Sequence, residues 1–169
     1  SAAELDRIES VAKLMSTKAP ISIRVNPDVD VNTHPYIATG LKENKFGVSI
    51  DKAFALYKKA ELSKHLEIIG LDYHIGSQIN EVSPFIEALE KAIELISRLK
   101  AEGIKISHID IGGGLGIAYN DEKTINIDRY IQSVLDKVGD LEVILEPGRA
   151  IVGDAGIFVT RVEYLKQSD

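Results

Sequence analysis

Cysteine is absent from the sequence, and histidine occurs only four times. A chain without cysteine can build neither a disulfide framework nor a thiolate metal site, and its composition suits a reducing cytoplasm, where we expect the protein to act. The histidines show none of the short spacings that are typical of zinc enzymes, so we predict no metal among the cofactors.

Long apolar runs and an excess of positive charge are also missing. No run approaches the roughly 20 residues of a membrane-spanning helix, and the N-terminus has a helical pattern rather than that of a signal peptide. The net charge of −6 and the pI of about 5.3 argue against a nucleic-acid surface. We therefore expect a small molecule as partner, with no role for nucleic acid or membrane.

The sequence does contain an alternation of strand-like and helical patterns. Apolar runs typical of buried strands lie at 21–26, 66–73, 106–111 and 141–146. Apolar residues at helical spacing lie near 5–15, 51–62, 84–102 and 126–138, with Ser83 as the expected cap of the third helix and Gly103 after its end. Strands joined by single helices form a parallel α/β sheet. Residues 1–153 are therefore predicted to form one α/β unit with four parallel strands.

Two segments depart from this alternation. Residues 28–48 are rich in Asn, Thr, Gly and Asp, and a connection of that length inside a domain is usually functional. Residues 157–165 alternate in the manner of a strand, and no helix follows them. We predict that residues 154–169 start a different, β-rich domain or form the connector to it.

Unusual residues lie where the predicted strands end. These are Arg-Val-Asn-Pro at 24–27, His-Ile-Gly-Ser at 74–77, three glycines at 112–114 and Glu-Pro-Gly-Arg at 146–149. The carboxyl ends of parallel strands form the ligand-binding rim of α/β proteins. We therefore expect these four segments to converge on one site.

The glycines at 112–114 and Ser77 are candidates for binding a phosphate. Glycine lets several N–H groups approach an anion closely, and a serine hydroxyl suits a phosphate oxygen. A tight turn explains the glycines equally well on its own. Neither a dinucleotide motif nor a Walker motif is present, and the serine-hydrolase motif Gly-x-Ser-x-Gly is missing too.

Three charged or titratable residues complete the candidate site. His74 could stack on a flat ring or transfer protons, although a single histidine is more often structural. Glu146 ends an apolar strand, and a structural ion pair with Arg149 would satisfy it. Alternatively, Glu146 could face a pyridinium nitrogen and keep it protonated. Arg149 would then be available for a phosphate or a carboxylate.

Taken together, these motifs resemble the diaminopimelate decarboxylases, which are fold-type III pyridoxal-phosphate-dependent decarboxylases. The resemblance covers nearly the whole chain. It rests on residues 24–30, Thr33-His34, Thr39-Gly40, Lys-Phe-Gly at 45–47, His-Ile-Gly-Ser-Gln-Ile at 74–79, residues 110–116 and residues 146–149. It implies that residues 1–153 are the second half of an alanine-racemase-like barrel, a (β/α)8 TIM-type barrel that needs about eight strands, and that a β domain follows. It also implies a carbon–carbon lyase of lysine biosynthesis that uses pyridoxal 5′-phosphate and converts meso-2,6-diaminopimelate to L-lysine and CO2.

The resemblance also implies a role for each residue. His74 would stack on the pyridoxal ring and Glu146 would pair with its nitrogen, so both are predicted to be catalytic. The serine and the three glycines would hold the phosphate. Arg149 would lie beside it and bind a substrate carboxylate, Arg24 would line the same cavity, and residues 45–47 would lie towards a homodimer partner. The implied cofactor-binding residues are His74, Ser77, Gly112, Gly113, Gly114, Glu146, Gly148 and Arg149.

Two features of these decarboxylases are not found in the sequence. The lysine that binds the cofactor covalently lies in an earlier strand, in a Tyr-x-x-Lys-Ala-like setting, and a later Cys-Glu-Ser segment supplies groups across the dimer; nothing here matches either. We therefore expect a fragment that is inactive alone and that self-associates through open sheet edges. The alternatives are a fragment of an ornithine, arginine or carboxynorspermidine decarboxylase, and a non-catalytic pyridoxal-phosphate- or phosphate-binding half-barrel. A Tyr-x-x-Lys motif upstream would favour the enzyme.

Overall fold

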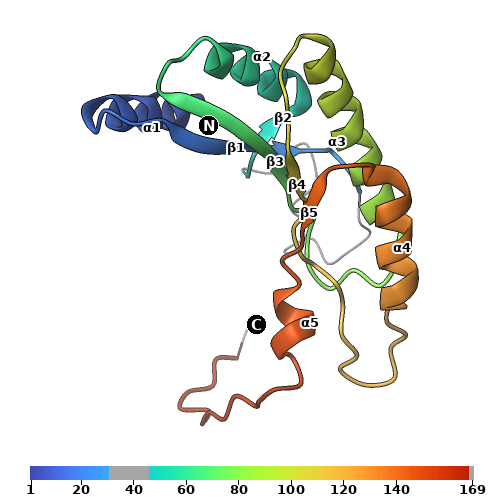
Figure 1. Cartoon of the computed structure of the whole chain (residues 1–169). Helices are drawn as coiled ribbons and strands as arrows, with labels where there is room; N and C mark the ends of the chain where they lie inside the picture. Colours follow the sequence, from blue (N-terminus) through green and yellow to red (C-terminus); the bar gives the residue numbers. More distant parts are fainter. Residues whose placement is uncertain (31–45, 168–169) are drawn as a thin grey trace.

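A computed structural model describes residues 1–30 and 46–167. In this part of the chain, five parallel strands form one sheet in the order β2-β1-β3-β4-β5 (Figure 1). They are β1 (Ala19–Asn26), β2 (Val48–Ser49), β3 (Leu66–Tyr73), β4 (His108–Asp110) and β5 (Glu142–Ile144). The predicted parallel α/β fold is confirmed. The sequence did not indicate β2, because two residues are too few to show a period.

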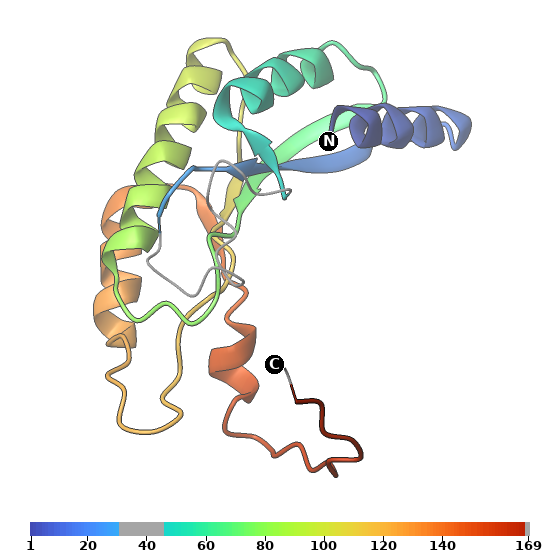
Figure 2. The same cartoon turned by 180° about the vertical axis from the view of Figure 1, so that it is seen from behind.

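Helices alternate with these strands along the chain. They are α1 (Ala2–Leu14), α2 (Ile50–Glu61), α3 (Ser83–Ala101), α4 (Ile127–Val138) and α5 (Gly148–Val152). Seen from both sides, α2, α3 and α4 lie over one face of the sheet, whereas α5 and the segment after it run away from the sheet (Figures 1 and 2). The opposite face of the strands therefore stays uncovered by these three helices.

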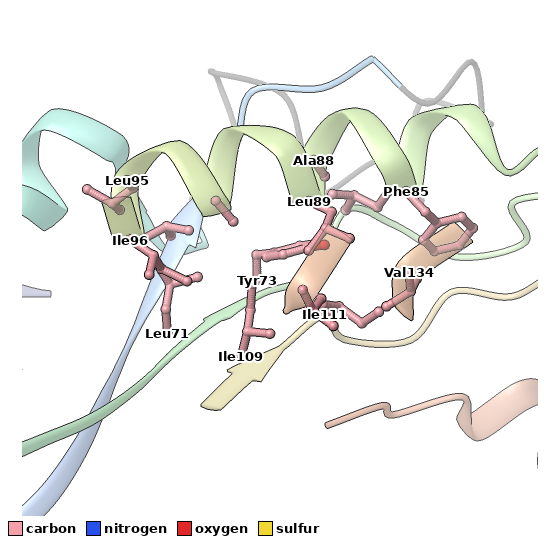
Figure 3. Packing of buried hydrophobic residues seen from close by; sticks show 14 of the residues in the cluster. Leu71, Tyr73, Phe85, Ala88, Leu89, Leu95, Ile96, Ile109, Ile111 and Val134 are labelled. Carbon is pink, nitrogen blue, oxygen red and sulfur yellow. The ribbon is translucent and has the colours of Figure 1, made fainter. Parts of the chain in front are cut away.

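The main core lies between α3 and the central strands (Figure 3). Apolar residues three or four positions apart put Phe85, Leu89 and Leu95 on one face of α3, where all three are buried. They pack over Leu71 of β3 and its neighbours. The Phe85 ring also meets the Tyr130 ring of α4 edge to face, with 5.0 Å between the centroids. Burial of each large apolar side chain contributes about 1.5–3 kcal/mol, so α3 fixes the sheet on which the site is built.

The other face of the strands carries polar side chains. Parallel register places Arg24 beside Asp72, and Asp72 beside Asp110. Because successive side chains of a strand point to opposite faces, these three lie on the face away from Leu71 and the core. His74, two residues after Asp72 and directly after the end of β3, continues the same alternation. The uncovered face therefore leads towards the predicted site.

The structure differs from the sequence-based expectations at the ends of elements. Ser83 is not the cap of α3: the helix begins at Ser83, Val82 is the N-cap, and no side-chain cap bond forms. The expected cap geometry is found instead at α4, where the Asn126 side chain accepts a hydrogen bond from the Arg129 N–H at 2.8 Å. The short α5 was not expected, because five residues carry little helical periodicity.

The two segments that departed from the strand–helix alternation, residues 28–48 and 157–165, are described by the structure to different extents. Residues 157–165 form no strand with the described part of the chain, and their apolar side chains, such as Phe158 and Leu165, are exposed. A strand needs the ladder of a neighbour, so the start of a β domain at 154 stays a prediction. Most of the connection at 28–48 lies outside the described residues, together with Thr33-His34, Thr39-Gly40 and Lys45.

Candidate functional site

Three of the four predicted strand-end segments meet at the carboxyl edge of the sheet. The Glu146 N–H, after β5, donates to the Gly112 carbonyl oxygen at 2.8 Å, and the Ile79 N–H, after β3, donates to the Gly114 carbonyl oxygen at 2.9 Å. The glycine segment after β4 therefore lies between the other two and is bonded to both. This arrangement follows from the strand order β3-β4-β5.

The glycines at 112–114 are packed too closely for any side chain. A Cβ atom at Gly113 would lie 2.0 Å from the Glu146 carbonyl oxygen, and one at Gly114 would lie 2.2 Å from that of Gly76. Gly112 and Gly114 also have φ of +70° and +103°, a region that other residues rarely adopt. Glycine is therefore required here for the loops to meet, whatever else these residues bind.

The N–H groups of this segment are not equivalent. The Gly112 N–H donates to Asp110 Oδ1 at 2.8 Å, and the Gly113 N–H donates to His74 Nδ1 at 3.2 Å. The Gly114 N–H has no partner within the described ranges. It is therefore the backbone donor of this segment that can bind an anion without breaking a protein hydrogen bond.

His74 is half-buried and electrically neutral near pH 7. Burial is the main cause that lowers the pKa of its ring, and the Arg24 guanidinium lowers the pKa further, against the opposing effects of Glu146 and Asp110. Its Nδ1 accepts the Gly113 N–H, so a neutral ring carries its proton on Nε2. The Gly113 N–H meets this ring at its edge, because the Nδ1 lone pair lies in the ring plane, and the hydrogen bond fixes the orientation of the imidazole.

Glu146 and Arg149 do not form the structural ion pair that was one interpretation of the sequence. Arg149 Nη1 donates to Gln78 Oε1 at 3.1 Å, and the guanidinium lies 5.9 Å from the centre of the Tyr119 ring. In the described chain, the Glu146 carboxylate takes part in no hydrogen bond and no ion pair. One carboxylate and one guanidinium are thus available at the edge of the sheet.

The remaining candidates lie beside them. Ser77 is half-buried in the turn after β3, and its hydroxyl makes no hydrogen bond with the rest of the described residues. Gly148 begins α5, and its N–H donates to the Glu146 carbonyl oxygen at 2.7 Å. Arg24 lies on β1, which neighbours β3 in the sheet, and its guanidinium is 5.4 Å from the centre of the Phe46 ring.

A pocket of about 440 Å³ lies beside β1 rather than at the three converging segments. Its lining includes Arg24, Asp72 and residues of α1, but not His74, Ser77, Glu146 or Arg149. We give the converging segments more weight as the candidate site, because they combine an anion-binding N–H, a guanidinium and a carboxylate. Arg24 faces this pocket, so the expectation that it lines the same cavity as His74 stays a prediction.

Sequence reasoning did not single out two polar features that border the site. Ser22 Oγ donates to Asp72 Oδ1 at 3.1 Å, and burial raises the pKa of Asp72 above its usual range. The alternation of polar and apolar residues in β1, β3 and β4 would have placed Asp72 and Asp110 on the face of His74. Gln78 bonds to Arg149 across 71 positions of sequence, and no local pattern indicates such a contact.

Comparisons with known proteins agree on one family. The sequence family described as "Pyridoxal-dependent decarboxylase, pyridoxal binding domain" matches residues 1–153. Diaminopimelate decarboxylase of Pseudomonas aeruginosa is 52% identical over 171 residues, which covers all of this chain and 41% of that protein. The Vibrio cholerae diaminopimelate decarboxylase is 50% identical over 98% of this chain and 40% of its own length.

Solved structures of similar fold include decarboxylases. The crystal structure of diaminopimelate decarboxylase from Helicobacter pylori complexed with L-lysine superposes with a TM-score of 0.86 at 45% identity, over 89% of this chain and 39% of that one. A lysine decarboxylase from Selenomonas ruminantium shares the fold at a TM-score of 0.70 and 24% identity. The chain spans about 40% of the length of the relatives that it matches. It belongs to the pyridoxal-dependent decarboxylase family, within whose pyridoxal-binding domain residues 1–153 lie.

Proposed function

We propose that the protein containing this chain decarboxylates meso-2,6-diaminopimelate to L-lysine and CO2, and that this chain supplies residues that bind pyridoxal 5′-phosphate. The relatives that are about half identical to it are diaminopimelate decarboxylases. The observation that carries the proposal is the separation of Glu146 from Arg149, which leaves a carboxylate and a guanidinium available beside the glycine segment.

The residues present suit a phosphorylated pyridine ring. The Ser77 hydroxyl, the Gly114 N–H and the Arg149 guanidinium are three donors for a phosphate, and Arg149 also suits a substrate carboxylate. The neutral imidazole of His74 suits the flat face of the ring. The Glu146 carboxylate would hold a proton on the ring nitrogen. When bound, pyridoxal phosphate supplies an electron sink for the carbon that loses its carboxyl group.

The chain alone is proposed to be inactive. Its sequence has no match to the cofactor-binding lysine or to the Cys-Glu-Ser segment that the resemblance implies. We place the intact protein in the cytoplasm, which the absence of cysteine supports, and propose that it is a homodimer, which the resemblance implies. Release of CO2 from diaminopimelate by the isolated chain with added cofactor, above the rate of the free cofactor, would overturn this part of the proposal.

The test is a titration of the full-length protein with pyridoxal phosphate, followed by absorbance. Arg149→Ala should weaken binding by roughly ten- to a hundredfold, because a hydrogen bond to a charged group contributes about 1.5–3 kcal/mol. Glu146→Gln should change affinity less and turnover more, since it acts on the ring nitrogen. Arg129→Ala, at an exposed position of α4, is the matched control.

Two outcomes count against the proposal. Equal cofactor affinity and equal KM in wild type and Arg149→Ala would mean that this arginine meets neither the phosphate nor the substrate. Comparison of kcat/KM for diaminopimelate, ornithine and arginine tests the substrate separately, and a preference for either of the last two would replace diaminopimelate.

A further inference from the structure

Gln78 joins three segments of the candidate site through one amide group. Its Nε2 donates to the Ile117 carbonyl oxygen at 2.6 Å, and its Oε1 accepts the Ile117 N–H at 3.3 Å and Arg149 Nη1 at 3.1 Å. The side chain therefore connects the turn after β3 with the segment after β4 and with α5. No role in binding or catalysis was expected for it above.

The backbone that follows Gln78 is held in place by two hydrogen bonds of Ile79. Gln78 has a φ of +59°, which is uncommon for a residue other than glycine. The next residue, Ile79, donates from its N–H to the Gly114 carbonyl oxygen at 2.9 Å and accepts the Gly116 N–H at 3.0 Å. The amide thus projects from a bonded frame, and it can hold Arg149 in a set position.

The amide oxygen of Gln78 suits the orientation of Arg149 because it accepts a hydrogen bond and carries no charge. An amide oxygen is neutral, so it can orient a guanidinium without cancelling its charge, whereas a carboxylate would compete with an anionic ligand. Arginine has five N–H donors, and Gln78 takes one of them. The others stay available for a phosphate or a carboxylate.

We propose that Gln78 is a positioning residue, which holds the Arg149 guanidinium in place for an anionic group of the cofactor or substrate while leaving its positive charge intact. This inference rests on the proposed function of Arg149. It assigns no contact between Gln78 and the reacting atoms.

The test is a double-mutant cycle in the full-length holoenzyme, with Gln78→Met and Arg149→Ala singly and together. The measured quantities are the dissociation constant of pyridoxal phosphate and, separately, KM and kcat for diaminopimelate. Gln78→Met should weaken Arg149-dependent binding about three- to tenfold, and this loss should disappear in the Arg149→Ala background, because residues that act as a unit are not additive. Gln132→Met is the matched control, since Gln132 bonds only to Asp136 on the exposed side of α4.

A second variant tests the charge argument. Gln78→Glu keeps an oxygen that can accept from Arg149 but adds a negative charge, so it should weaken anion binding more than Gln78→Met does. If Gln78→Met fails to fold, Gln78→Glu is compared with the wild type and with Arg149→Ala instead: it should bind the anion more weakly than the wild type, and this loss should disappear in the Arg149→Ala background.

The outcomes separate the inference from the proposed function. If Arg149→Ala weakens binding but neither Gln78 variant does, the positioning role is wrong and the function of Arg149 stands. Additive losses in the double variant would also overturn it, because they would assign Gln78 a purely structural effect. If Arg149→Ala changes neither the dissociation constant nor KM, the proposed function of Arg149 itself fails.

Discussion

At the scale of single residues, the site is defined by which polar groups are already bonded to the protein. His74 accepts the Gly113 N–H, and Arg149 donates to Gln78, whereas the Glu146 carboxylate has no hydrogen bond or ion pair within the described chain. The hydrogen bonds hold the His74 ring and the Arg149 guanidinium in orientation. The Glu146 carboxylate and the remaining N–H donors of Arg149 are available to a ligand.

The titration of His74 is a direct test of its surroundings. We expect its pKa to lie below the usual value of about 6.5, because burial and the Arg24 guanidinium both disfavour the protonated ring. Arg24→Met should raise the pKa of His74, and Glu146→Gln should lower it further, since the Glu146 carboxylate favours the protonated ring. NMR titration of the histidine ring protons measures all three values, with His74→Asn to assign the signal.

Two results decide this prediction: the pKa of His74 in the unmodified chain, and the direction in which Glu146→Gln changes it. A pKa of His74 at or above 6.5 in the folded chain would contradict the assigned burial and the role of Arg24. An increase in Glu146→Gln would show that the carboxylate does not act on the ring.

At the scale of elements, the sequence predicted what depends on local patterns. The helices at 2–14, 50–61, 83–101 and 127–138 follow from apolar periods that span many residues. The strands β1, β3, β4 and β5 coincide with the predicted apolar runs, although β4 and β5 have only three residues each. The convergence of His74, Gly112 and Glu146 followed from the rule that parallel strands end at one edge. What could not be predicted depends on contacts between distant segments, such as the β2 pairing with β1 and the bond from Arg149 to Gln78.

The contribution of α3 to the sheet can be measured at Leu89. Its side chain is completely buried against the central strands, so Leu89→Ala should lower the free energy of unfolding by about 2–5 kcal/mol, through lost burial and a residual cavity. Leu135→Ala in α4, where the leucine is 55% exposed, should change it by less than about 0.5 kcal/mol. Urea denaturation followed by circular dichroism gives both values, and equal effects would mean that α3 does not carry the core.

At the scale of the whole molecule, the sheet formed by residues 1–30 and 46–167 is open at both edges. Within these ranges, β2 pairs only with Val25 and Asn26 of β1, and β5 pairs only with β4. The segment after β5 also exposes large apolar side chains, among them Ile151 and Phe158. Unpaired strand edges and exposed apolar surface both favour association with another chain.

We therefore expect the isolated chain to form dimers or larger assemblies at micromolar concentration. Light scattering after size-exclusion chromatography measures the mass directly. Ile144→Lys places a charge in the edge strand β5 and should shift the distribution towards monomer, whereas the same change at the exposed Ile127 of α4 should not. A monodisperse monomer of the unmodified chain would contradict this expectation.

The order of the strands has a consequence for how the chain is made. Apart from β2, the sheet order β1-β3-β4-β5 is also the order in which these strands leave the ribosome. Each new strand therefore meets a partner that has already been synthesised, and it adds to the growing side of the sheet with its crossover helix. An unpaired strand edge is a site of wrong pairing with other chains, and here each edge can pair as soon as the next strand of the sheet has been made. The glycine segment and Glu146, which come from the last two strands, can take their places only when this growth reaches β5.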